Sequence, residues 1–139
     1  MTIHTLLPDT DTLHGDFSPD RAPVLRIKSG DSIEAKTLDA GWGVEAPNLQ
    51  GTQRQRHPAF DMQIMRGHAM LGPVWIDGAQ AGMTLKITFD EIVPGDFGFT
   101  YSGGFDHRVH RNLGFVEDDE LLTLWTLDAE TMMGINQHG

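Results

Sequence analysis

Residues 72–90 read GPVWIDGAQAGMTLKITFD. From Met83 to Asp90, apolar side chains alternate with polar ones, which is the period of a half-buried β-strand. The short apolar run at 74–76 precedes this strand, and the glycine-rich residues 77–82 between the two are typical of a turn. The stretch therefore predicts a β-hairpin.

A similar pattern stands earlier in the chain. Residues 24–27 read as a strand, residues 28–31 as a turn, and residues 33–37 alternate again between apolar and polar. Two hairpins of one kind favour a common β-sandwich or barrel. The predicted fold class is all-β, with jelly-roll-like hairpins, long loops and little helix.

The remaining segments are less regular. We expect an ordered N-terminal arm over 1–22, which is polar and broken by prolines, and a long surface loop over 44–66. The glycine- and aromatic-rich residues 95–105 suit either an irregular strand or a loop lining a cleft. Residues 121–127 predict a buried strand after an acidic turn, and 129–132 a turn of helix.

The composition limits the classes of protein to which the chain can belong. The 139 residues suit a single β-domain, and 39% hydrophobic with 22% charged residues is a globular composition. The formal charge of −10 opposes binding to nucleic acid or to an anionic membrane surface. With no cysteine, disulfides and thiolate sites are excluded, so any metal must be held by histidine and carboxylate side chains.

Signals for targeting and for nucleotide binding are missing from the sequence. The N-terminus has no basic start followed by an apolar run, and no window has the ~18 apolar residues of a membrane helix. A cytoplasmic protein is therefore expected. The sequence has neither a phosphate-binding glycine loop nor the Gly-x-Ser-x-Gly arrangement of a serine hydrolase.

Candidate site residues lie at the ends of the predicted strands. His68 stands just ahead of the strand that begins near Gly72, and Asp39 follows the first hairpin. An imidazole and a carboxylate from two strand ends are the donors of a hydrolytic zinc-type site. The alternative is that Asp39 caps a tight turn and His68 bonds to backbone. His14 in the arm is a weaker candidate, and the pair His107 and His110 is expected on an exposed loop.

Several stretches resemble the opening of the acetamidase/formamidase family, in the family's order. They are DTLHGDFS (11–18), PVL (23–25), SGD (29–31), TLD (37–39) and GHAMLGPVWIDGAQAGMTL (67–85). The last is the most specific, because it carries a histidine, three residues, Gly-Pro-Val, and then Gly-Ala and Gly before a strand. The resemblance extends from about residue 4 to about residue 100.

This resemblance implies a β-rich metal-dependent hydrolase that converts short linear amides, such as formamide or acetamide, to carboxylate and ammonia. It implies a divalent metal, with zinc as the first candidate. The metal activates the attacking water, and a carboxylate relays a proton to the leaving amine. Carried over by position, His68 is the first ligand, Asp39 the second, and His14 lies close to the site. His68 and Asp39 are also the expected catalytic residues.

The sequence departs from the family in two places. Met83 follows the glycine of the second turn where an aspartate is common, which alters turn chemistry. The motifs of the family's second half, of His-Gly-Gly-Asn and Gly-Asp-His types, do not occur here. We therefore expect the chain to act with a complementing second half. The alternatives are a non-catalytic β-module that binds a small polar ligand, or a homo-oligomerisation unit.

Overall fold

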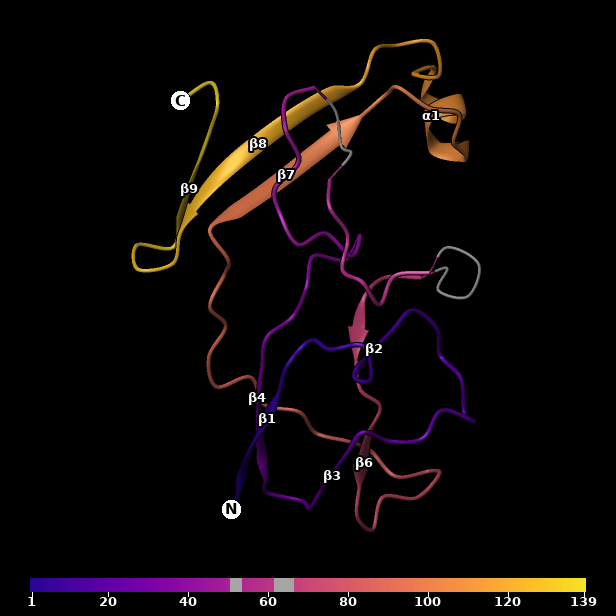
Figure 1. Cartoon of the computed structure of the whole chain (residues 1–139), viewed down its shortest axis with the longest axis vertical. Coiled ribbons are helices and arrows are strands. Elements are labelled where there is room, and N and C mark those ends of the chain that lie inside the picture. The colour runs from indigo at the N-terminus through magenta and orange to yellow at the C-terminus, as the bar shows by residue number, and fades with distance from the viewer. Residues whose placement is uncertain (51–53, 62–66) are drawn as a thin grey trace. The chain divides into compact units, whose positions relative to one another are not determined.

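The computed structural model of the chain describes residues 1–50, 54–61 and 67–139. The backbone contacts divide it into two compact units, unit 1 (1–44 and 55–88) and unit 2 (45–54 and 89–139). Strands form most of the regular structure, with one six-residue helix among the described residues, so the all-β prediction is confirmed (Figure 1). No helix in the described part of the chain is long and apolar enough to cross a bilayer.

Unit 1 contains three two-stranded sheets. In the first, β1 (Ile3–Leu6) runs parallel to β4 (Ser32–Ala35). In the second, β2 (Leu13–His14) pairs antiparallel with β5 (Met70–Leu71). In the third, β3 (Leu25–Ile27) runs parallel to β6 (Val74–Ile76).

These pairings correct the prediction of the first hairpin. Strands formed close to the expected places, as β3 and β4, but they do not pair with each other. Each takes a parallel partner from a distant part of the chain instead. The turn between them does form, because Gly30 adopts a φ of +90° and the Asp31 amide donates to the Lys28 carbonyl at 3.0 Å. The turn sends the chain onward into a second sheet.

The prediction of the second hairpin, over residues 74–89, is also wrong. Its first strand exists as β6, but residues 83–89 form no strand, although their alternation is regular. The side chains of Met83, Leu85, Ile87 and Phe89 are all exposed. The period of a sequence shows that a segment suits a half-buried sheet, and it does not supply the partner strand.

Residues 1–22, expected as an arm, contain β1 and β2. Of the predicted loop 44–66, residues 51–53 and 62–66 lie outside the described residues. The described parts, 44–50 and 54–61, contain no strand longer than a single bridge residue, such as Arg56 opposite Gly43.

Unit 2 is built on one antiparallel sheet in the order β7-β8-β9. Its strands are β7 (Phe97–Ser102), β8 (Leu121–Asp128) and β9 (Met133–Asn136). Of the two alternatives left open for 95–105, the strand is confirmed, and 121–127 also forms the predicted strand. Its expected burial is wrong, because Leu122 alone is buried there and Leu121 is 64% exposed. Residues 129–132 form the turn of the β8–β9 hairpin instead of a turn of helix.

The helix α1 (Arg108–Leu113) lies between β7 and β8 and carries a cap at each end. The His107 ring accepts a hydrogen bond from the Val109 amide, and Gly114 ends the helix with a φ of +78°. The large apolar side chains buried in the described structure are few. They are Leu6, Leu13 and Trp42 in unit 1 and Leu122 in unit 2.

Candidate functional site

The three segments that carry His14, Asp39 and His68 meet in unit 1. The β2–β5 register places His14 opposite Met70, two residues after His68. The Ala69 amide donates to the Ala40 carbonyl at 3.0 Å, which ties the residue after His68 to the residue after Asp39. The His14 and Asp39 segments, which precede the His68 segment by 54 and 29 residues in the sequence, are therefore both joined to it within one or two residues of each candidate.

The third contact of this arrangement is between two glycines. Gly67 packs so tightly on Gly15 that a Cβ on Gly67 would overlap the Gly15 carbonyl oxygen. Gly15 follows His14, and Gly67 precedes His68. The absence of a side chain at Gly67 therefore lets the two histidine-bearing backbones approach each other.

His14 is held as a metal ligand would be. Its side chain is buried, and Nδ1 lies 2.9 Å from the Asp16 carbonyl oxygen. Because a carbonyl oxygen only accepts, Nδ1 carries the hydrogen, and in the neutral ring Nε2 keeps its lone pair. Fixing one ring nitrogen on a carbonyl is the usual way in which proteins orient a ligating histidine. Nε2 also faces Gly72, lying 3.8 Å from the place where a Cβ would stand.

Asp39 is half-buried and organises a turn. Its Oδ2 accepts a hydrogen bond from the Gly43 amide at 3.0 Å, and its carbonyl accepts one from the Trp42 amide at 2.9 Å. The turn-capping alternative for Asp39 is thus confirmed. The same bonds fix the Asp39 carboxylate within the 39–43 turn, whose Ala40 carbonyl is bonded to the Ala69 amide.

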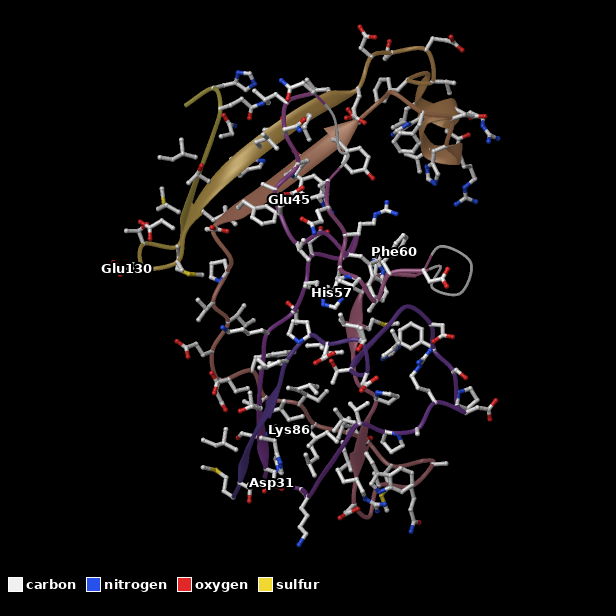
Figure 2. All side chains as sticks on the ribbon, in the orientation of Figure 1. Asp31, Glu45, His57, Phe60, Lys86 and Glu130 are labelled. Carbon is white, nitrogen blue, oxygen red and sulfur yellow. The ribbon has the colours of Figure 1, made fainter. Side chains whose placement is uncertain are left out.

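Trp42 was missed by the sequence analysis and is the most buried large side chain described, with 1% of its surface exposed. Its indole Nε1 donates to the Gly67 carbonyl at 2.9 Å, and its ring packs on Phe60, with the centroids 5.7 Å apart. Phe60 and its neighbour His57 are labelled in Figure 2. The tryptophan adopts a φ of +66°, which is rare for a bulky residue. In the sequence, the position of Trp42 between Gly41 and Gly43 was the feature that could have singled it out.

The side chain of His68 is exposed. Within 1–50, 54–61 and 67–139, no hydrogen bond to its ring is formed, so the alternative of a backbone-bonded His68 finds no support there. Over the same residues, no three histidine or acidic side chains lie close enough together to hold a metal ion. The backbone thus assembles the three candidates, but their side chains do not form a complete ligand set.

The donor types nevertheless suit a divalent cation. Two imidazoles and a carboxylate are borderline-to-hard ligands, and His14 already presents an oriented lone pair. His14 and His68 would be the nitrogen donors and Asp39 the oxygen donor. A metal bound by these three would need a change in the His68 or Asp39 side-chain conformation.

The other histidine pair has a different role. His110 lies in α1 rather than on an exposed loop; it is buried, and its Nδ1 lies 3.0 Å from the Phe105 carbonyl oxygen. The His107 Nδ1 accepts the capping hydrogen bond of α1. Both rings therefore serve the helix and its packing on Phe105, whose ring centroid is 4.5 Å from that of His110.

A carboxylate with a strongly shifted pKa lies away from these segments. Asp31, labelled in Figure 2, accepts hydrogen bonds from the amides of Lys28 and Thr2 at 3.0 and 2.8 Å and faces His4 Nε2 at 3.3 Å. These bonds favour the ionised form and lower the pKa of Asp31 from 3.8 to about 2. Asp31 thereby joins the start of β1 to the turn before β4, which is a structural role.

Comparison with protein-family models, with curated proteins and with solved structures gives no match to this chain.

Proposed function

We propose that unit 1 contributes part of the active site of a metal-dependent hydrolase that converts short linear amides to carboxylate and ammonia. The observation that supports this proposal is the meeting of the His14, Asp39 and His68 segments through the Ala69–Ala40 and Gly67–Gly15 contacts. These are the residues to which the resemblance assigns metal and substrate chemistry. Three separate stretches of sequence have no local reason to converge on one another.

The proposal gives each residue a task. His14 holds a divalent metal, zinc first, through Nε2, because its other nitrogen is fixed on the Asp16 carbonyl. His68 is the exposed second nitrogen donor, and Asp39 supplies a carboxylate as ligand or proton relay. When bound, such a metal supplies a water of lowered pKa and polarises the amide carbonyl. A complementing second half supplies the remaining ligands and the acid that protonates the leaving amine.

The cellular setting follows the same proposal. A sequence without cysteine suits a reducing compartment, and we propose the cytoplasm. A short amide is small and neutral, so the net charge of −10 does not oppose its approach.

Metal analysis of the purified chain tests the site without depending on activity. We expect zinc to bind, and His68→Ala and His14→Ala each to weaken zinc binding by at least about tenfold, because the loss of even a hydrogen-bond partner of a ligand typically costs about 10- to 100-fold in metal affinity. His138→Ala is the matched control, because His138 is an exposed histidine in unit 2. Ammonia release from formamide and acetamide is measured on the same samples. A chain that binds no zinc and releases no ammonia contradicts the proposal.

A second candidate is a non-catalytic β-module. It is favoured by the small number of buried apolar side chains in the described structure and by the many exposed ones. A module of this kind would bind no zinc through His14 or His68, so the same metal analysis separates the two functions.

A further inference from the structure

The segment 83–93 exposes an unusual amount of apolar surface. Six of its eleven side chains are large and apolar, and each is between 59% and 76% exposed. They are Met83, Leu85, Ile87, Phe89, Ile92 and Val93. Figure 1 draws this stretch as coil between β6 and β7. A single exposed leucine is ordinary on a protein surface, but six within eleven residues mark a contact surface.

The backbone of this segment has no partner strand. Within the described residues, the amides and carbonyls of 84–93 form no hydrogen bond with any other part of the chain. The sequence is rich in β-branched and aromatic residues and alternates with period two from 83 to 90. A strand-forming segment with unpaired backbone groups is a template for pairing with another strand.

We infer that the 83–93 segment pairs through residues 86–90 with the same residues of a second copy of this chain, antiparallel about a two-fold axis at Thr88. In this register Lys86 lies opposite Asp90 of the partner subunit, and the symmetry repeats the pair. Ile87 lies opposite Phe89 of the partner subunit, also twice. Both kinds of cross-strand pair stabilise a sheet.

Charge selects this register among the alternatives. Within residues 86–90, an axis between two residues places apolar side chains opposite polar ones, so the axis must pass through a residue. An axis at Lys86 or at Asp90 places a charge opposite itself, and an axis at Ile87 or Phe89 leaves Lys86 without an acidic partner. Only the axis at Thr88 pairs the two opposite charges. The pairing matters because two copies with a net charge of −10 each repel one another.

Reciprocal charge reversal tests both the partner and the register. Sedimentation of the full 139-residue chain over a range of concentrations measures the dimer dissociation constant. Lys86→Asp and Asp90→Lys each turn two attractive pairs into repulsive ones, and each should weaken the dimer by about tenfold or more. The double variant Lys86→Asp/Asp90→Lys restores both pairs, so its affinity should return to within about threefold of the original.

Both side chains are exposed, so the variants are expected to fold, which circular dichroism checks. Lys36→Asp is the matched control, since it makes the same charge change at an exposed lysine outside the segment. It should leave the dimer unaffected. A chain that stays monomeric at all concentrations overturns the inference and assigns the segment to a different partner. A double variant no tighter than the single ones also overturns it.

Discussion

Replacement of Trp42 by phenylalanine should destabilise unit 1 through two separate losses. The variant removes the indole donor of the 2.9 Å bond to the Gly67 carbonyl, and a hydrogen bond of this kind contributes about 1 kcal/mol. The smaller ring also leaves a gap at a side chain that is 1% exposed, and such a gap costs about another 1 kcal/mol. The expected loss in the free energy of unfolding is therefore about 2 kcal/mol.

Trp42→Ala extends the same series. It removes the whole ring, including the packing on Phe60, and should cost about 3 to 5 kcal/mol. A positive φ is also unfavourable for alanine, so the truncation does not relieve the backbone strain at this position. Domains of this size are stable by only about 5 to 15 kcal/mol, so this variant should be close to unfolding in unit 1.

Urea unfolding followed by circular dichroism measures these differences, and amide hydrogen exchange over 69–76 assigns them to unit 1. Trp75→Phe is the control, because Trp75 is 48% exposed and its ring contacts the Arg26 guanidinium, 5.2 Å from the ring centroid. That exposed cation–π contact is worth at most about 1 kcal/mol. If Trp42→Phe costs no more than Trp75→Phe, the reasoning on the buried indole is refuted.

Three further outcomes are expected. The pKa of Asp31 is lowered to about 2 in the folded chain, so the ionised Asp31 contributes its full stability above pH ~3.8 and loses it as the pH falls toward 2. The difference in urea midpoint between the original chain and Asp31→Asn should therefore shrink as the pH is lowered over that range. Gly67→Ala should destabilise the chain by more than about 3 kcal/mol, because the added Cβ meets the Gly15 carbonyl. Gly30 has open space around it, so Gly30→Ala should cost only about 1 kcal/mol, for the positive φ of that position. Thermal melts of the two variants measure the difference. Gln137→Ala removes the side-chain bonds to the Leu124 amide and the Leu122 carbonyl, at 2.8 and 2.9 Å, and should lower the stability of unit 2 by about 1 to 2 kcal/mol, seen as faster exchange of the β8 amides.

The positions of strands were more predictable than their partners. The alternation over 33–37 and the apolar residues 121–127 correctly indicated β4 and β8, because period and composition are local properties. The partners of β3 and β4 are parallel strands from elsewhere in the chain, and no local pattern encodes such a choice. The helix α1 has only six residues, too few for a helical period to be recognised.

The candidate site was predictable in its residues and less so in its geometry. A strand that begins shortly after His68 and a turn at Asp39 could be predicted from glycines and apolar runs. That the two segments are linked by a bond between Ala69 and Ala40 depends on backbone atoms, which the side-chain pattern does not specify. The role of Trp42 depends on the same kind of contact, since its indole bonds to a carbonyl 25 residues away.

The parallel pairing of β3 with β6 also affects how unit 1 comes into being. Residue 25 and its partner 74 are about 50 residues apart, and at a translation rate of about 5 to 20 residues per second the first strand waits about 3 to 10 s for the second. Contacts this distant in sequence raise the contact order and slow folding. In unit 2 the β8–β9 hairpin closes over a four-residue turn, an event of about 1 to 10 μs. The two units of one chain are therefore expected to fold at different rates. The nascent β2 and β3 edges stay open to chaperones until residue 76 has emerged from the ribosome.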